Sequence, residues 1–427
     1  MKFDYGKKGI EINLDPSWKV TILHPENQVV IENPVKNIRE AIKNPIGCPP
    51  LSDIIKKKGS SQTVCIVVSD ATRPVPSHFI LEALVKELNE YGISTENINI
   101  LVATGLHRAS SGDEIEHIVG KKIARQRINI LSHVAKEKTL QKYLGESSDG
   151  SPIYINKNFY EADLKILTGY VEPHFFFGFS GGRKSLIPGI AGEETILNNH
   201  TADMVASPYA RFGMYKKNPM HKQSLEMAMK AEVDFIINIC INEEHKVTQV
   251  AAGDLKKAHE YLVNYQLQHV FKEIKEPYDI VICGNGGYPL DLNLYQAVKS
   301  MAIGEIYVKR GGTIISVNEC SEGVGIGQDK FKELISSEKN PEEIYNKIIQ
   351  KEIVVPDQWQ IQVLTRILMK SEIYLVSSMN EEEIGNIGLK YADTVENAIK
   401  KSLIKHGKDA TILILPNGPQ ILPIINI

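Results

Sequence analysis

Short apolar runs rich in β-branched residues alternate along the chain with stretches in which apolar residues recur at helical spacing. This alternation is typical of α/β proteins with mostly parallel sheets. In the first part of the chain it predicts strands at Thr63–Ser69, Ile98–Ala103, Leu164–Thr168, Phe235–Ile241 and Val247–Ala251. It predicts helices over Phe79–Tyr91, Asp113–Val119 and Lys256–Val270.

A second α/β unit begins after Lys275–Pro277, which has the composition of a domain boundary. Its strands are predicted at Tyr278–Cys283, Thr313–Val317 and Ile373–Val376, with a helix near Leu292–Ala302. We therefore expect an N-terminal α/β domain over residues 1–274 and a C-terminal α/β domain over residues 275–408. One more strand falls within residues 409–427, and the pattern leaves open whether it returns to the N-terminal domain.

Composition narrows the class of protein. A chain of 427 residues is too long for one ordinary core, which agrees with two domains. Its net charge of −3 gives no electrostatic reason to bind nucleic acid or an anionic membrane. No apolar run has the length of a signal peptide core or a bilayer span. The five cysteines are scattered without a CxxC pair, which argues against zinc ribbons, iron–sulfur sites and disulfide frameworks. We expect a reduced, cytoplasmic protein.

Polar clusters follow several of the predicted strands. They read SDATRP, TGLHR, TGY, CGNGG and SVNEC. In open parallel sheets, ligands bind beyond the carboxyl ends of the strands, where loops from several strands converge. The five clusters therefore predict one composite site, which we expect in a cleft between the two domains.

The segment from His174 to Lys184 combines a glycine-rich loop with a histidine and an amine. Its glycines allow a backbone to approach a ligand closely, and a lysine beside them can bind a phosphate or form a covalent bond to a cofactor. It is not a Walker A loop, since that motif needs a glycine directly before the lysine and the residue there is Arg183. Nor does the CGNGGYP segment match GxGxxG, because the third glycine would fall on Pro289.

Several side chains near these motifs admit both a structural and a functional interpretation. Asp70 and Thr72 could cap the following helix, whereas Arg73 suits a phosphate or carboxylate. His107 and His174 could be ordinary satisfied histidines, or a general acid/base pair acting on opposite faces of a substrate.

The remaining candidates also admit both a structural and a functional interpretation. His200 could end a short helix or bind a metal, although no cysteine or carboxylate stands at ligand spacing from it. Gln296 and Lys299 share one helix face, suited either to a small carboxylate or to solvent. Trp359 could line a ligand pocket or cover a seam between domains.

Taken together, these motifs closely resemble the nickel-dependent lactate racemase family over essentially the whole chain. The resemblance rests on the DATRP, GLHR and GFSGGRK segments, on His174 and His200, and on the YQAVK segment. It implies a nickel pyridinium-3,5-bisthiocarboxylic acid mononucleotide cofactor, a nickel pincer, tethered to Lys184 through a thioamide. It further implies that His200 ligates the nickel, and that the nucleotide is held by Asp70, Ala71, Thr72, Arg73 and Pro188.

The resemblance also implies an activity. His107 and His174 would exchange the hydroxyl proton of lactate while the C2 hydrogen moves as hydride to the cofactor and back, through pyruvate. The substrate would be held by Arg73, Tyr295, Gln296, Lys299 and Trp359. Cofactor-maturation proteins would be required as partners.

Two alternatives stay open from the sequence. The first is a racemase or epimerase of another 2-hydroxy acid in the same family, and the second is a non-catalytic protein that binds an anionic ligand. A metal-dependent hydrolase is disfavoured, because paired carboxylates and HxH-type ligand sets are missing from the strand ends.

Overall fold

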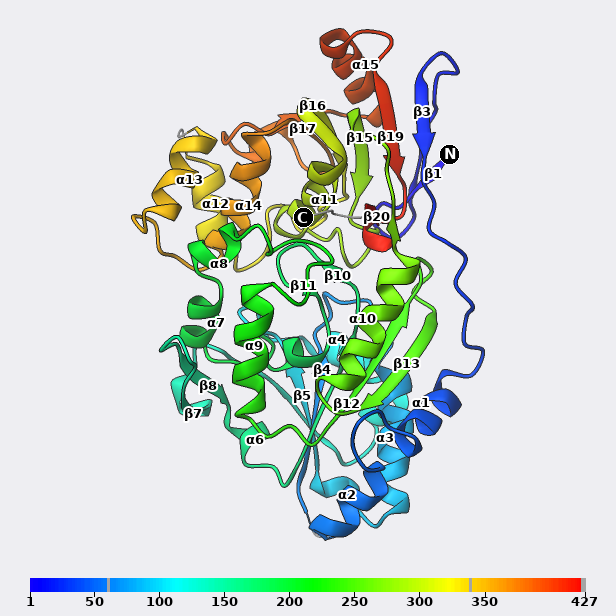
Figure 1. Cartoon of the computed structure of the whole chain (residues 1–427), viewed down its shortest axis with the longest axis vertical. Coiled ribbons are helices and arrows are strands. Elements are labelled where there is room, and N and C mark those ends of the chain that lie inside the picture. Colours follow the sequence, from blue (N-terminus) through cyan, green and yellow to red (C-terminus); the bar gives the residue numbers. More distant parts are fainter. Residues whose placement is uncertain (60–61, 338–339, 424–427) are drawn as a thin grey trace. The chain divides into compact units, whose positions relative to one another are not determined.

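The computed structural model describes residues 1–59, 62–337 and 340–423, which form two compact units (Figure 1). We call the first the cradle unit, made of Asn27–His200 and Ser207–Gln268. The second is the terminal unit, made of Met1–Glu26, Thr201–Ala206 and the chain from His269 onward. Each unit has its own six-stranded sheet.

The sheet of the cradle unit has the strand order β13-β12-β9-β4-β5-β6. Its strands are β4 (Val64–Ser69), β5 (Ile98–Ala103), β6 (Asn129–Ser132), β9 (Leu164–Tyr170), β12 (Phe235–Ile241) and β13 (Val247–Gly253). All neighbours pair in parallel except β12 and β13. Every residue of β9 and β12 is buried, which explains why these strands read as continuous apolar runs and do not alternate.

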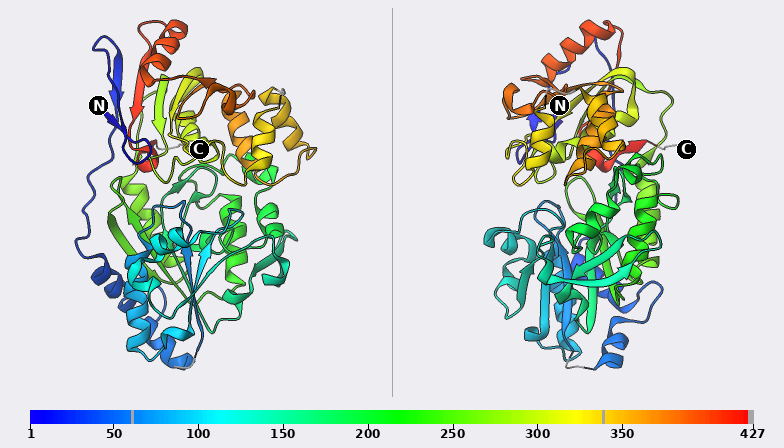
Figure 2. Two further views of the ribbon diagram at one scale, coloured as in Figure 1. Left: turned by 180° about the vertical axis from the view of Figure 1, so that it is seen from behind. Right: turned by 90° about the vertical axis from the view of Figure 1, so that its left-hand side faces the viewer.

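Helices and small hairpins complete the cradle unit. The helices are α1 (Pro34–Lys43), α2 (Leu51–Lys58), α3 (Ser77–Glu90), α4 (Gly112–Val119), α5 (Lys121–Ala124), α6 (Lys157–Tyr160), α7 (Glu193–Asn199), α9 (Pro219–Met229) and α10 (Lys257–His269), with 3-10 turns η1 (Thr95–Asn97), η2 (Lys138–Leu140) and η3 (Gly182–Ser185). The hairpins pair β7 (Gln141–Glu146) with β8 (Pro152–Asn156) and β10 (Pro173–His174) with β11 (Gly178–Phe179). Apolar residues of α1, α2 and α3 pack with those of the sheet into one core, and Figure 2 shows this sheet from behind.

The sheet of the terminal unit has the order β18-β17-β16-β15-β19-β3 and is parallel throughout. Its strands are β3 (Lys19–Ile22), β15 (Tyr278–Gly284), β16 (Val308–Val317), β17 (Glu372–Val376), β18 (Lys390–Tyr391) and β19 (Thr411–Leu415). Its helices are α8 (Ala202–Ala206), α11 (Leu294–Tyr307), α12 (Asp329–Ile335), α13 (Pro341–Ile349), α14 (Gln358–Leu368) and α15 (Val395–His406), with 3-10 turns η4 (Glu381–Ile384) and η5 (Gly418–Gln420). Two short pairs join β1 (Lys2–Phe3) to β2 (Ile10–Glu11) and β14 (Phe271–Lys272) to β20 (Leu422–Pro423).

The predicted fold class, α/β with mostly parallel sheets, is confirmed. The division of the chain differs from the expected boundaries at residues 274 and 408. Residues 1–26 lie in the terminal unit, because β3 pairs in parallel with β19. The last strand does not return to the first sheet, since β19 lies between β15 and β3 and satisfies backbone groups on both of its edges.

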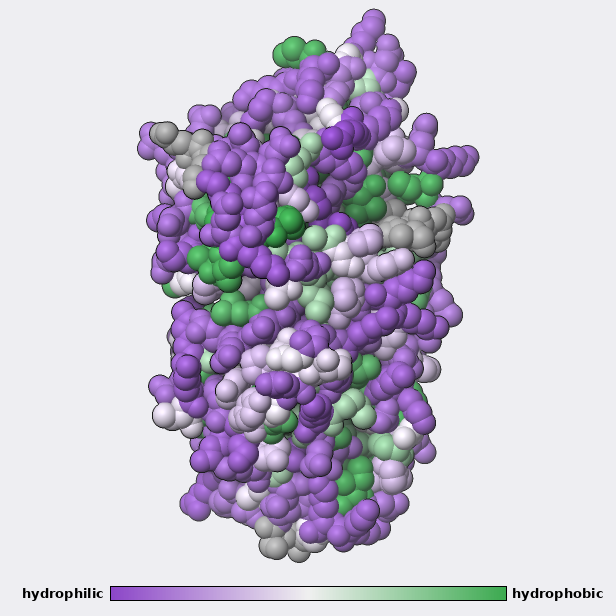
Figure 3. Space-filling view, turned by 60° about the vertical axis from the view of Figure 1, so that its left-hand side comes forward, coloured by the Kyte–Doolittle hydropathy of each residue, from purple (hydrophilic) through white to green (hydrophobic). Residues whose placement is uncertain are grey.

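Figure 3 shows a face dominated by hydrophilic residues, with hydrophobic residues in small groups. Large exposed apolar side chains such as Val29 and Ile404 are far apart in the sequence. Among the described residues, no helix is both long and apolar enough to cross a lipid bilayer.

Candidate active site

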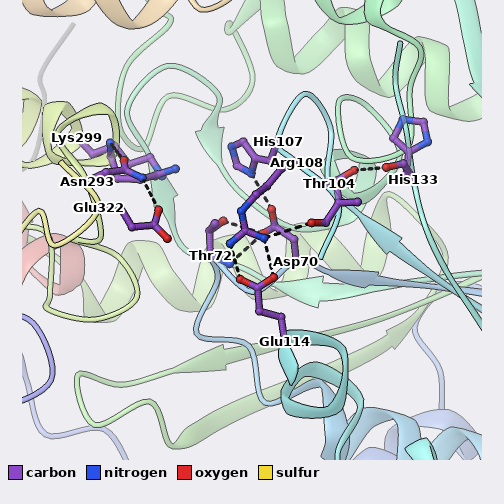
Figure 4. A network of polar contacts seen from close by, with 12 residues as sticks. Asp70, Thr72, Thr104, His107, Arg108, Glu114, His133, Asn293, Lys299 and Glu322 are labelled. Atoms are coloured by element: carbon purple, nitrogen blue, oxygen red, sulfur yellow. Dashed lines mark hydrogen bonds and ion pairs between the residues drawn. The ribbon is translucent and has the colours of Figure 1, made fainter. Parts of the chain in front are cut away.

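An Asp–His pair lies at the carboxyl ends of two adjacent strands of the cradle unit. Asp70 follows β4 and His107 follows β5 within the next loop, and the two strands pair in parallel. The Nδ1 atom of His107 lies 2.7 Å from Oδ2 of Asp70. Figure 4 shows the His107 ring directed at this carboxylate, with Thr72 on its other side. The predicted convergence of these two loops is therefore seen directly.

The electrostatics of this pair keep Asp70 ionised. Burial alone would raise the pKa of Asp70, but His107, Arg73 and the Thr72 hydroxyl lower this pKa to about 2. The hydroxyl of Thr72 donates to Oδ1 of Asp70 over 2.7 Å. A carboxylate can only accept, so Nδ1 of His107 carries the proton and Nε2 is the proton-accepting nitrogen of the neutral ring.

Neither Asp70 nor Thr72 caps the helix that follows them, which was one of the two interpretations from sequence. Helix α3 begins at Ser77 after Pro76, without a side-chain cap. Arg73 lies next to this pair, and its Nη1 atom is buried with no hydrogen-bond partner in the described part of the chain. A buried guanidinium N–H in that state suits an incoming anionic group.

The loop that carries His107 is held from both sides. Arg108 forms two bonds with Glu114 on α4, of 2.8 Å and 2.7 Å. On the other side, the Thr104 hydroxyl donates to the His133 carbonyl over 2.6 Å. These contacts appear in Figure 4 and fix the loop on the sheet. Arg108 had no separate role in the sequence prediction, and here it anchors the loop.

His174 lies on the β10–β11 hairpin and is buried among aromatic rings. Its ring centroid is 4.7 Å from that of Phe176 and 5.6 Å from that of Phe177. Its Nδ1 atom accepts from the backbone N–H of Phe177 at 3.3 Å and from that of Phe176 at 3.5 Å. In the neutral ring the proton therefore lies on Nε2. Nδ1 therefore orients both candidate acid/base histidines. Its partner is a carboxylate in His107 and backbone N–H groups in His174.

The polar side chains of Arg183 and Asn238 fix the glycine-rich loop. Arg183 is only 1% exposed, and it donates to the carbonyls of Phe177 and Gly181, both at 3.2 Å. Burial lowers the pKa of this guanidinium to about 9. Asn238 on β12 accepts from the Gly182 N–H over 2.7 Å. These bonds hold the two segments that carry His174 and Lys184.

Lys184 and His200 both lie against one aromatic ring, that of Phe177. The Nζ atom of Lys184 is 4.4 Å from the centroid of Phe177, and the His200 ring centroid is 5.3 Å from it. Nδ1 of His200 is 2.9 Å from the Ile196 carbonyl, so Nδ1 donates and the lone pair of the neutral ring lies on Nε2. Burial lowers the pKa of His200 to about 3, and the neighbouring Lys184 also lowers it.

The candidates of the terminal unit form their own polar group at the start of α11 and α14. Nζ of Lys299 donates to Oε1 of Gln296 over 2.7 Å, so these two side chains share one face of α11 as expected. The Trp359 indole N–H donates to the Tyr295 hydroxyl over 3.0 Å. Gln296, Tyr295 and Trp359 are buried, and Lys299 is partly buried.

The structure thus separates the predicted site residues into two sets. Residues 70–73, His107, His174, Lys184, Pro188 and His200 all belong to the cradle unit, and Tyr295, Gln296, Lys299 and Trp359 to the terminal unit. Sequence analysis missed Arg183 and Asn238. An asparagine within the apolar run FIINICI was a usable signal, since a polar residue in a buried strand needs a partner.

Two family models match the chain over most of its length. One, the lactate racemase N-terminal domain, matches residues 5–213, and the other, the lactate racemase C-terminal domain, matches residues 274–422. The chain belongs to the lactate racemase family. As a member of this family it is an isomerase of the racemase class.

Relatives agree with the family models. The lactate racemase of Thermoanaerobacterium thermosaccharolyticum is 36% identical over 388 residues, which cover 90% of this chain and 89% of that protein. The lactate racemase of Lactiplantibacillus plantarum is 36% identical over 390 residues, with the same coverage of 90% and 89%.

Solved structures show the same architecture. The lactate racemase apoprotein from Thermoanaerobacterium thermosaccharolyticum matches with a TM-score of 0.90 at 33% identity, covering 99% of each chain. A protein from Thermotoga maritima matches with a TM-score of 0.71 at 21% identity, covering 92% of this chain and 99% of its own. This second likeness concerns the fold alone.

Proposed function

We propose that this protein is a lactate racemase, which interconverts L- and D-lactate. The observation that carries the proposal is the pair His107 and His174, each oriented through Nδ1, in the same unit as Lys184 and His200. Relatives named lactate racemase, 36% identical over 90% of the chain, support the choice of substrate.

We propose further that the cradle unit holds a nickel pincer nucleotide through Lys184 and His200. His200 fits the role of a nickel ligand, because its Nδ1–H bond to the Ile196 carbonyl fixes the tautomer with the lone pair on Nε2. Its lowered pKa keeps the imidazole neutral, as ligation requires. When bound, this cofactor would accept the C2 hydrogen of lactate as hydride and return it to pyruvate.

The polar side chains around the nucleotide would come from the loop after β4 and from the glycine-rich segment. Arg73 brings a buried guanidinium N–H without a partner in the described chain, which suits a phosphate or carboxylate oxygen. Ala71, Thr72 and Pro188 would line the same part of the unit. Asp70 has a different role in this proposal, because both of its carboxylate oxygens already engage protein groups, on His107 and Thr72.

Proton transfer in this proposal belongs to the two histidines. His107 would take the hydroxyl proton of one enantiomer at Nε2, and His174 would serve the opposite enantiomer. Asp70 holds the His107 ring through the 2.7 Å contact to Nδ1. Because Nδ1 carries the proton of the neutral ring, Nε2 is left to accept the hydroxyl proton.

Substrate binding in this proposal uses Arg73 and the polar group of the terminal unit. Lys299 brings a positive charge suited to the lactate carboxylate, and Gln296 holds its ammonium through a 2.7 Å bond. Tyr295 and Trp359 would supply the pocket around the methyl group. The same groups would serve another small 2-hydroxy acid, so a panel of such acids must accompany lactate in the assay.

The first test is peptide mass spectrometry on protein made in a nickel-replete host with the cofactor-maturation proteins. We expect a sulfur-containing, nucleotide-sized adduct on Lys184, absent from Lys184→Ala, together with loss of racemisation. Exposed Lys122, paired with Glu82, gives the matched control Lys122→Ala, which should keep both adduct and activity.

Separate substitutions test the acid/base pair. His107→Ala and His174→Ala should each retain the adduct and stop racemisation, since they remove proton transfer and leave the tether. Full lactate racemisation by Lys184→Ala would overturn the cofactor assignment. If the enzyme racemises another 2-hydroxy acid of the panel but not lactate, that acid replaces lactate as the proposed substrate.

A further inference from the structure

Asp357 has two unusual properties at the start of α14. Its backbone is left-handed, with φ of 66° and ψ of 4°, which an L-residue other than glycine adopts only occasionally. It also occupies the N-cap position, where an aspartate usually accepts a backbone N–H of the first turn, yet its side chain makes no such bond. A left-handed backbone combined with a missing cap bond indicates that the Asp357 side chain serves another contact.

The carboxylate of Asp357 is bound to a residue 62 positions away. Its Oδ1 atom accepts from the Tyr295 hydroxyl over 3.0 Å, and the same hydroxyl oxygen accepts from the Trp359 indole over 3.0 Å. The three side chains are 8%, 7% and 5% exposed, in the order Asp357, Tyr295 and Trp359. A buried relay therefore runs from indole to phenol to carboxylate.

Further contacts hold Tyr295 in place. The side-chain amide of Gln360 donates to the Tyr295 carbonyl, and the Phe331 ring meets the Tyr295 ring edge-on at a centroid distance of 5.4 Å. The Tyr295 hydroxyl gives its only proton to Asp357. It therefore has no second proton to donate to a substrate carboxylate.

We propose that Asp357 is a positioning residue that, through Tyr295, fixes the Trp359 indole as a wall of the substrate pocket. The left-handed backbone directs the carboxylate toward α11, and the carboxylate therefore does not cap α14. Tyr295 acts by aiming Trp359 and not as a hydrogen-bond donor to substrate. The part of the inference that concerns substrate rests on the proposed function.

The relay itself can be tested without cofactor or substrate. The chain has two tryptophans, so Trp18→Phe leaves Trp359 as the only indole reporter. In that background Asp357→Ala and Tyr295→Phe should each shift the Trp359 emission maximum to the red. The double variant should match the single ones, since both changes break one relay. Asp357→Asn keeps an acceptor oxygen and tolerates left-handed backbone, so it should restore the wild-type emission.

The control for a lost charge is Asp329→Ala, at the exposed first position of α12 in the same unit. Asp357→Gly, which suits a positive φ, replaces Asp357→Ala if the latter does not fold. Unchanged emission in both Asp357→Ala and Tyr295→Phe, or shifts that simply add in the double variant, would overturn the relay.

Kinetics of the cofactor-loaded enzyme test the role toward substrate. Asp357→Ala should raise KM for lactate about fivefold to tenfold and change kcat by less than about twofold, because the wall contributes to binding alike before and during the reaction. Unaltered KM with shifted emission would show that the relay exists but does not face substrate. If the parent enzyme fails to racemise lactate, the proposed function fails while the emission result still decides the relay.

Discussion

At the scale of single residues, the contacts of Asp70 differ from both roles that its motif predicted. The sequence offered a helix cap or a ligand-binding carboxylate. The folded chain instead directs Asp70 at His107 on the neighbouring strand end, with its second oxygen bound by Thr72. His174 has no such arrangement at Nδ1, which faces two backbone amides. The two histidines are thus oriented by different means, and only one of them has a carboxylate at hydrogen-bond distance from Nδ1.

Asp70→Asn should lower kcat for lactate about a hundredfold or more, because an amide no longer fixes the His107 tautomer that leaves Nε2 to accept the proton. The free energy of unfolding at neutral pH should fall by only about 2 kcal/mol, the order expected from the lowered pKa of this carboxyl. That part of the stability is present above the ordinary pKa of aspartate and is lost as the pH falls toward 2. Steady-state kinetics and urea unfolding check the two values.

The control is Asp113→Asn, on the exposed first turn of α4, which should change neither quantity. Wild-type kcat in Asp70→Asn would remove Asp70 from the proton-transfer machinery. Adduct formation on Lys184 should persist in this variant, which separates a defect in proton transfer from one in cofactor binding.

At the scale of elements, the β10–β11 hairpin places His174 and depends on one glycine. Gly178 pairs with His174 across the hairpin and has φ of 78°. A Cβ atom built there would lie 1.9 Å from the Met214 carbonyl oxygen. Both the backbone conformation and the packing therefore exclude a side chain, and the glycine is needed to hold the hairpin in place.

Gly178→Ala should destabilise the protein by several kcal/mol, on the order of 3, since a left-handed alanine costs about 1–2 kcal/mol and the clash adds to it. Gly145→Ala is the matched control, because Gly145 also has a positive φ, of 94°, but nothing lies within 4 Å of its Cβ position. It should cost about 1 kcal/mol. Chemical denaturation measures both, and equal losses would show that packing at the hairpin is unimportant.

Most strands of the two sheets were predictable. The apolar runs after residues 62, 97 and 163 became β4, β5 and β9, and the predicted helix Phe79–Tyr91 became α3 (Ser77–Glu90). These strands are buried on both faces, so their composition alone identifies them. The hairpins, the 3-10 turns and the helices α1, α2, α9 and α12 to α15 escaped prediction. The two-residue strands of the β10–β11 hairpin carry no periodicity and depend on contacts distant in sequence.

At the scale of the whole molecule, the chain crosses between its two units several times. Residues 1–26 and 201–206 join the terminal unit, whose larger part begins at His269. Strand β3 is only 4 residues long, with mostly exposed side chains, and its partner β19 lies nearly 400 residues later. Its place in the second sheet follows from backbone pairing and has no signature in the local sequence.

The cradle unit also buries histidines whose lowered pKa predicts acid sensitivity. Burial lowers the pKa of His133 to about 4, of His259 to about 3 and of His221 to about 2. These groups bind protons in the unfolded chain from about pH 6.5 downward, while the folded state stays neutral. Stability is therefore present above pH 6.5 and is lost progressively as the pH falls.

We expect the apparent free energy of unfolding to drop by at least about 2 kcal/mol between pH 6.5 and pH 5, at about 1 kcal/mol per unit of pH for each such histidine. Urea titrations across this range measure the slope. His133→Gln should reduce it, because one titrating group is removed from the unfolded chain. A flat profile from pH 6.5 to pH 5 would contradict the buried neutral state of these histidines.

The sequence by itself determined the α/β class and most strands of the two sheets, and it singled out the candidate site residues, because apolar runs and the glycine-rich loop with its lysine are local properties. Tertiary structure alone decided the partner of Asp70, the orientation of the two histidine rings, the buried clamp of Arg183 and the relay ending at Asp357. Each of these depends on which strand ends and helix starts become neighbours. Backbone pairing across long stretches of chain sets those neighbours, and no local pattern encodes them.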